Sequence, residues 1–158
     1  MQFSILRETL LKPLQLVAGV VERRQTLPVL SNVLLLLKDD QLSLTGTDLE
    51  VELVGRIPVD EGSVGGEITV PARKFMDICK SLPDNAKISF SVENQKVTIK
   101  SGRSRFTLST LPASEFPSVE DGPNTVSFAI QQKQLKRLID AVSFSMAQQD
   151  VRYYLNGM

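Results

Sequence analysis

The C-terminal part of this chain repeats the pattern of residues that opens it. Shifting residues 126–158 back by 125 positions aligns identical residues at five places, namely Phe3 with Phe128, Ile5 with Ile130, Leu10 with Leu135, Val17 with Val142 and Leu30 with Leu155. Self-similarity at a long fixed period is typical of proteins built from repeated modules. The sequence therefore predicts a first domain over 1–125 and the incomplete start of a second, similar domain over 126–158. The pattern alone leaves open the alternative that 126–158 completes the first domain.

Within the first domain the pattern alternates between short strands and two helices. Strands are expected at residues 3–6, 27–37, 41–45, 49–59, 67–70, 87–92, 96–100 and 105–109, and helices at 8–21 and 72–82. The glycine-rich stretch 62–66 reads as a flexible hairpin loop. In the second domain a helix is expected at 132–147 and a strand over 151–158. This order indicates an α+β fold, in which an antiparallel sheet carries two helices on one face.

The stretch 111–125 interrupts the periodicity with three prolines and three acidic residues. A proline-rich, acidic segment between two periodic blocks is typical of an interdomain connector. It ends where the repeat predicts the second domain to begin.

Residues that carry catalysis are scarce. The chain has no histidine, so the usual base of a nucleophile and the commonest metal ligand are both missing. Asp48, Glu50 and Glu52 alternate along the expected strand 49–59 and its approach, which indicates one solvated face of a sheet. Cys79 lies among apolar residues at helical spacing and reads as a buried core thiol. The sequence therefore predicts a protein that is not an enzyme and needs no metal or cofactor.

Charge is distributed unevenly, although 18 basic and 18 acidic residues cancel. The helical segments 6–24, 72–82 and 132–147 hold ten basic and four acidic residues, whereas the rest of the chain holds eight basic and fourteen acidic ones. We therefore expect a basic helix face and an acidic outer rim, to which a polyanion could bind through its backbone. No apolar run reaches the roughly 18–20 residues of a membrane helix, which favours a soluble, cytoplasmic protein without a membrane partner.

Several short stretches of the sequence resemble those of a known family. TGTDLE (45–50), VPARKF (70–75), SGRSRFTLSTLP (101–112) and QDVRYYLNGM (149–158), with LLKPLQ and LPVLSN nearer the start, closely resemble the bacterial DNA polymerase III beta subunits, the sliding clamps. This resemblance implies a DNA polymerase processivity factor: a homodimeric ring of six similar domains whose helices line a hole that holds duplex DNA. It also implies two protein partners, the DNA polymerase III catalytic subunit and an ATP-driven clamp loader.

The resemblance assigns roles to particular positions. Those that match DNA-facing residues of the family are Arg24, Gln149, Tyr153 and Tyr154. Those that match the ring interface with the neighbouring chain are Lys74, Arg103, Arg105, Phe106 and Leu108. Those that match part of the groove for linear peptides of polymerases and loader are Arg152 and Leu155. The tyrosine rings could stack on exposed bases, with ordinary sheet packing as the alternative.

The resemblance covers the first domain of a clamp and about the opening quarter of the second. We therefore expect this chain by itself not to close a ring, and residues 126–158 to dock back, to pair with another copy or to be poorly ordered. Without these matching sequence stretches, the chain could be a small α+β module that binds nucleic acid independently of sequence and works without any ring. An enzyme with a carboxylate metal site is a third and weaker reading.

Overall fold

The computed structural model describes residues 1–21, 27–117, 128–147 and 150–157. The chain divides into two compact units, Met1–Val119 and Glu120–Met158. The first, which we call unit 1, holds every strand of the described chain, and the second, unit 2, holds one α-helix and two 3-10 turns.

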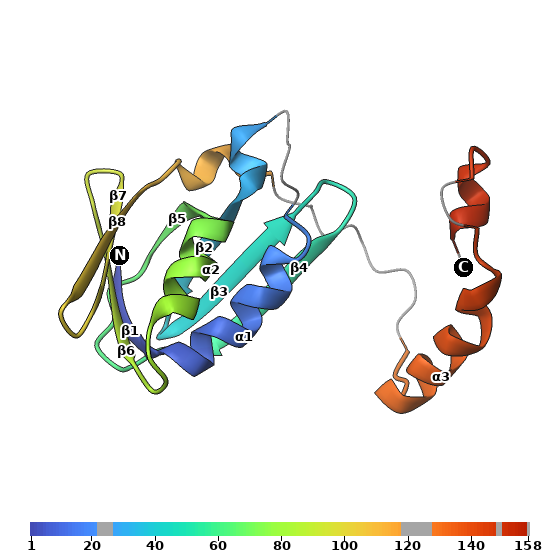
Figure 1. The fold of residues 1–158 in the computed structure, drawn as a ribbon, viewed down its shortest axis with the longest axis horizontal. Coiled ribbons are helices and arrows are strands. Elements are labelled where there is room, and N and C mark those ends of the chain that lie inside the picture. Colours follow the sequence, from blue (N-terminus) through green and yellow to red (C-terminus); the bar gives the residue numbers. More distant parts are fainter. Residues whose placement is uncertain (22–26, 118–127, 148–149, 158) are drawn as a thin grey trace. The chain divides into compact units, whose positions relative to one another are not determined.

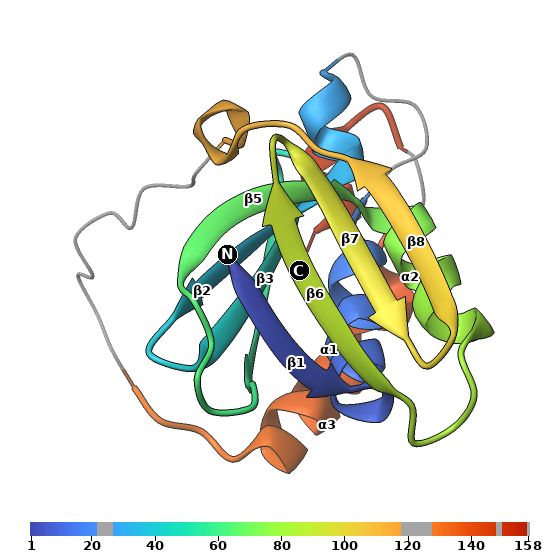
Figure 2. The same cartoon turned by 90° about the vertical axis from the view of Figure 1, so that its left-hand side faces the viewer.

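Unit 1 contains two four-stranded antiparallel sheets (Figures 1 and 2). Sheet 1 has the order β1 (Gln2–Leu6), β6 (Lys87–Glu93), β7 (Lys96–Ser101), β8 (Ser104–Ser109). Sheet 2 has the order β4 (Glu52–Pro58), β3 (Gln41–Thr47), β2 (Asn32–Lys38), β5 (Gly66–Pro71). The α+β class expected from the sequence is confirmed, but the strands form two sheets rather than one. The reason is that β5 returns to pair with β2 while β1 pairs with β6.

The same topology corrects the expectation for the glycine-rich stretch 62–66. It joins β4 to β5, which lie at opposite edges of sheet 2, so it is not a hairpin loop. Instead Val64 bridges to Gln2 of β1.

Two helices, α1 (Arg7–Ala18) and α2 (Ala72–Ser81), lie on the same side of the sheets (Figure 1). α1 packs over β3 and β4, whereas α2 packs against α1 and reaches β2, β5 and β8. The core therefore consists of one stripe from each helix and the inward face of both sheets, and includes Leu10, Leu14, Val17, Phe75, Cys79, Leu35, Leu44, Ile88, Phe90 and Ile99. The rings of Phe3 and Phe90 stack with centroids 4.7 Å apart.

Helix α1 approaches sheet 2 closely because two strand positions have no side chain. A Cβ atom on Gly46 would lie 2.7 Å from the carbonyl oxygen of Val17, and one on Gly55 would lie 3.0 Å from Cβ of Pro13. Pro13, expected to act as a kink or a late first turn, thus packs against β4. The helix ends at Ala18, three residues before the expected position 21.

Two expected strands begin later than predicted. Residues Pro28–Ser31 form a 3-10 turn, because Val29 and Leu30 are both buried, and an extended strand would turn one of them outward. β4 starts only at Glu52, because the carboxylate of Asp48 accepts backbone N–H groups of Glu50 (2.9 Å) and Val51 (2.7 Å) and closes a turn. Asp48 and Glu50 are therefore not on a strand face. Those backbone donors also lower the pKa of Asp48.

The first part of the expected connector 111–125 is fastened to unit 1. The backbone N–H of Thr69 donates to the carbonyl oxygen of Leu111 at 3.2 Å, and Phe116 is buried against Val29 and Leu30. Residues 118–125 lie outside the described residues.

Unit 2 contains α3 (Gln132–Val142) followed by the 3-10 turns Ser143–Ser145 and Tyr153–Asn156. The helix predicted over 132–147 is thus shorter, and the strand predicted over 151–158 is wrong for residues 151–157: that segment is a turn stabilised by its own hydrogen bonds. No residue described in unit 2 is buried. None of the helices in the described ranges is long and apolar enough to cross a membrane.

Candidate functional surfaces

The four edge strands of unit 1 differ in whether their outer edges are occupied. At β1, Gln2 and Val64 exchange backbone hydrogen bonds of 2.9 and 2.8 Å, and at β5, Thr69 pairs with Leu111. Among the described residues no segment pairs with the outer edges of β8 and β4. These two free edges lie at opposite ends of unit 1 (Figure 1). An unpaired strand edge is a template for another strand or chain.

The five residues expected at a ring interface gather at the β8 end. Lys74 projects from the first turns of α2, and α2 lies next to β8. Arg103 in the β7–β8 turn and Arg105 in β8 are exposed, and Phe106 is half-buried. Leu108 is only 8% exposed and belongs to the core, so it supports this surface from below.

The chain segments that contain the two sheets differ in charge, whereas the sequence predicts one acidic outer rim. Residues 32–71, which contain sheet 2, hold eight acidic and two basic residues, whereas residues 84–109, which contain β6 to β8, hold five basic and two acidic ones. The β8 end is therefore basic, whereas the acidic residues nearest the β4 edge are Asp48, Glu50 and Glu52, in and beside the turn between β3 and β4. Counting charges by helix and non-helix could not reveal this, because it depends on which strands share a sheet.

The expected basic helix face is present in unit 1. Lys12 on α1 and Arg73, Lys74 and Lys80 on α2 are exposed, and the one exposed acid of these helices is Asp77. Arg7 differs from them because its side chain is only 14% exposed and its guanidinium binds Asp84 (2.8 Å), Glu8 (3.1 Å) and the carbonyl oxygen of Cys79 (2.9 Å). It is a structural residue.

Of the four residues expected to face DNA, the structure describes two. Tyr153 and Tyr154 lie in the turn Tyr153–Asn156, are 83% and 68% exposed, and meet edge to face with ring centroids 6.1 Å apart. They do not pack in a sheet, which was the alternative expectation. Arg24 and Gln149 lie outside the described residues.

The two residues expected in a peptide groove lie in the same turn but differ in surroundings. Leu155 lines a shallow hollow together with Val142, Ser145, Met146, Tyr154 and Gly157. The guanidinium of Arg152 does not join that lining. It makes a two-point contact with the carboxylate of Asp150, from Nε to Oδ1 at 3.1 Å and from Nη2 to Oδ2 at 3.0 Å.

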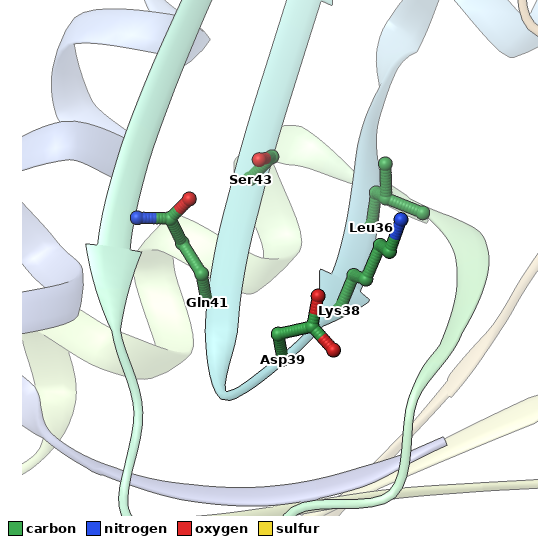
Figure 3. A pocket seen from close by; sticks show the side chains of 5 residues that line it. All are labelled: Leu36, Lys38, Asp39, Gln41 and Ser43. Atoms are coloured by element: carbon green, nitrogen blue, oxygen red, sulfur yellow. The ribbon is translucent and has the colours of Figure 1, made fainter.

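Three features of the described ranges bear on catalysis. No group of three His, Cys, Asp or Glu residues that could hold a metal ion occurs in the described ranges. A hollow on the outward face of the β2–β3 hairpin is lined by Leu36, Lys38, Asp39, Gln41 and Ser43, whose polar ends point apart rather than toward one point (Figure 3). Burial raises the pKa of the Cys79 thiol to about 12, so it is not a nucleophile at neutral pH.

Asp150 and Asn156, the residues around which the tyrosine turn is built, are not among the site residues predicted from the sequence. An aspartate whose carboxylate accepts the backbone N–H two residues on, as Asp150 accepts that of Arg152, is an ordinary turn-former. The strand-like letters VRYYL obscured it, because aromatic and β-branched residues also favour strands.

Comparison with known proteins identifies the family. Residues 1–120 match the family described as "DNA polymerase III beta subunit, N-terminal domain", and residues 129–158 match "DNA polymerase III beta subunit, central domain". A Pseudomonas aeruginosa protein named beta sliding clamp is 70% identical over 158 residues, and an Escherichia coli K12 protein of the same name is 54% identical over 158 residues. The chain spans 43% of the length of each of these curated relatives.

The fold agrees with this assignment. The crystal structure of the DNA polymerase III subunit beta from Pseudomonas aeruginosa superposes with a TM-score of 0.96 at 68% identity, covering 100% of this chain and 43% of that one. The Caulobacter crescentus pol III beta gives a TM-score of 0.92 at 41% identity, covering 99% of this chain and 42% of that one. One family description covers well over half of the chain, and the shared fold extends over its whole length. The chain therefore belongs to the DNA polymerase III beta subunit family.

Proposed function

We propose that this chain is part of a DNA polymerase processivity factor: a ring that encircles duplex DNA and tethers the replicative polymerase to it. Residues 1–125 form the first ring domain in this proposal, and residues 126–158 begin the second. The protein catalyses no reaction itself. It works in the cytoplasm, where a bacterial chromosome lies, and its other partners are the DNA polymerase III catalytic subunit and the clamp loader.

The observation that carries the proposal is the polarity of unit 1. One end offers the free edge of β8 with exposed Arg103 and Arg105, and the opposite end offers the free edge of β4 beside the acidic Asp48, Glu50 and Glu52. Two unlike, complementary ends favour head-to-tail contacts, which close into rings when the rotation between copies permits. We assign Lys74, Arg103, Arg105 and Phe106 to the interface with the neighbouring chain, with Leu108 supporting them from the core.

The helix face gives the ring a surface for DNA. Lys12, Arg73 and Lys80 attract phosphates without reading bases, so such a surface is indifferent to sequence and weakens as salt rises. A tether that works by encirclement has no need of tight binding. Arg24, Gln149, Tyr153 and Tyr154 complete the proposed DNA contacts. Leu155 contributes to the proposed peptide groove, and Arg152 stands beside it in the chain with its guanidinium bound to Asp150.

Retention on circular and linear DNA tests the proposal directly. The protein should contain this chain together with the remaining length found in its curated relatives, and it should be loaded with the clamp loader and ATP onto primed circular DNA. We expect it to stay with the circle during gel filtration at physiological salt and to leave once the circle is cut. Equal retention on circular and linear DNA, falling steeply with salt, would instead identify a surface-binding module.

A charge-reversal pair tests the interface. Arg105→Glu at the free edge of β8 should weaken assembly about tenfold or more, because it opposes an acidic partner surface, as measured by sedimentation velocity. Lys38→Glu makes the same charge change at the exposed β2–β3 hairpin and serves as the control. If both variants assemble like the parent, the β8 edge is not the interface.

A further inference from the structure

Residues 150–156 present two aromatic side chains that nothing in unit 2 covers among the residues described. Tyr153 and Tyr154 form an edge-to-face pair with an interplanar angle of 77°, and both rings are largely exposed. An exposed aromatic pair lowers its free energy by burying apolar area, so a turn that keeps it exposed needs a specific restraint. The hydrogen bonds of the turn show where that restraint comes from.

Asp150 takes part in five hydrogen bonds, all of them within the turn. Its carboxylate accepts the backbone N–H of Arg152 at 2.8 Å and two guanidinium donors at 3.1 and 3.0 Å. Its backbone N–H donates to Oδ1 of Asn156 at 3.1 Å, and its carbonyl oxygen accepts Nδ2 of Asn156 at 3.1 Å. The two ends of the segment that carries the tyrosines are therefore joined by hydrogen bonds among Asp150, Arg152 and Asn156.

Two backbone hydrogen bonds complete the restraint. The N–H of Leu155 donates to the carbonyl oxygen of Arg152 at 2.8 Å, which closes the turn around the tyrosines. The N–H of Ala147 donates to the carbonyl oxygen of Leu155 at 2.9 Å, which fastens the turn to the segment after α3. The tyrosines thus stand between fixed points on both sides.

We propose that Asp150 and Asn156 are positioning residues for the Tyr153–Tyr154 pair, and that Arg152 positions the same pair rather than contacting a partner with its own charge. The guanidinium fork of Arg152 already binds a carboxylate at two points, so two of its donors are used and an opposite charge lies directly beside it. The positioning role stands on this geometry alone. That the tyrosines then contact nucleic-acid bases rests on the function proposed above.

The charge interaction supports the same reading. The hydrogen bonds from Arg152 lower the pKa of Asp150, and the carboxylate in turn raises the pKa of Arg152. The pair is therefore ionised across the whole physiological pH range. A turn whose aromatic side chains are held before binding loses less conformational entropy when a partner arrives.

Loop order provides the first test, and the chain carries its own probe. It contains two tyrosines and no tryptophan, so its ultraviolet emission reports on Tyr153 and Tyr154 alone. In Asp150→Ala we expect the emission anisotropy to fall and the backbone order parameters of residues 152–156 to drop from about 0.85 to below about 0.6. Asp150→Asn retains one acceptor oxygen, so its anisotropy should lie between those of the parent and Asp150→Ala. Asp140→Ala, which removes an exposed carboxylate paired with Lys136 on α3, is the matched control. An unchanged anisotropy in Asp150→Ala would overturn the proposal.

Binding to a fluorescein-labelled oligodeoxythymidine provides the second test, because the two roles of Arg152 predict opposite signs. Asp150→Ala removes a negative charge and releases a cation, so a direct phosphate contact by Arg152 predicts tighter binding. Positioning predicts binding about three- to tenfold weaker, since two side chains become disordered. Tighter binding by Asp150→Ala would overturn the role given to Arg152. If the parent chain does not bind the oligonucleotide, base stacking by this chain is refuted, and the order measurement decides the positioning role by itself.

Discussion

Units 1 and 2 contain the same sequence pattern in two different states of burial. Leu10 on α1 is fully buried and its repeat partner Leu135 on α3 is 44% exposed, and Val17 and Val142 differ in the same way, at 1% and 48%. Both helices have an apolar stripe, but α1 lies on strands of its own unit, whereas the described residues of unit 2 form no strand. The periodicity of a sequence therefore predicts which face of a helix can be buried, whereas the burial itself depends on which strands are present to cover it.

The largest expected difference between the units comes from truncating these two equivalent leucines. Leu10→Ala should reduce the free energy of unfolding of unit 1 by about 2–5 kcal/mol, because it leaves a cavity in a closed core. Leu135→Ala should change the free energy of unfolding of unit 1 by less than about 0.5 kcal/mol. Urea titrations followed by the reactivity of Cys79 measure this, since Cys79 is buried in unit 1 and is the only cysteine of the chain. Equal losses in the two variants would contradict the comparison.

Two glycines, Gly46 in unit 1 and Gly157 in unit 2, differ in the room that an added Cβ atom would find. Gly46→Ala places a Cβ atom 2.7 Å from the Val17 carbonyl oxygen and 2.9 Å from Val17 Cγ1, so it should destabilise unit 1 by about 1–3 kcal/mol as α1 moves off the sheet. At Gly157 in unit 2, nothing lies within 4 Å of an added Cβ atom. Gly157→Ala should therefore have no measurable effect in the same titration. A neutral Gly46→Ala would mean that α1 shifts without cost.

Removing an ion pair should produce a smaller difference in the free energy of unfolding between the two units. Arg7 in unit 1 is nearly buried and binds three acceptors, so Arg7→Met should reduce the free energy of unfolding by about 1–2 kcal/mol. The pair of Lys136 and Asp140 on α3 has a shorter N to O distance, 2.6 Å, but both side chains are mostly exposed. Lys136→Met should cost at most about 0.5 kcal/mol. The comparison would fail if the exposed pair contributed as much as Arg7, as judged by urea midpoints.

The comparison also explains which parts of the fold and the candidate surfaces the sequence could predict. Helix α2 and the strands β6 to β8 were predicted within one residue at every end, because Pro71 stands at the start of the helix and short turns separate the strands. The pairing of β5 with β2, and with it the division of the strands into two sheets, depends on contacts between distant segments that no local pattern contains. The tyrosine turn was misread as a strand, because a strand forms only where another strand pairs with it, and here the hydrogen bonds of Asp150 prevailed.

The smallest expected difference between the two units is in how their stability depends on acid pH. The backbone N–H of Asn85, which donates to Glu8 at 2.9 Å, is the main reason why the pKa of Glu8 in unit 1 lies below its ordinary value of 4.5. In unit 2 the hydrogen bonds from Arg152 hold the pKa of Asp150 below its ordinary value of 3.8. A carboxylate with a lowered pKa stabilises the folded state fully above its ordinary value, and this stabilisation is lost as the pH falls through the lowered pKa. In pulsed-labelling experiments, Glu8→Gln should therefore flatten the acid dependence of Cys79 protection and leave that of the tyrosine anisotropy unchanged. Asp150→Asn should flatten the acid dependence of the tyrosine anisotropy and leave that of Cys79 protection unchanged. If either substitution altered both signals, the two units would be coupled and could no longer be treated as independent.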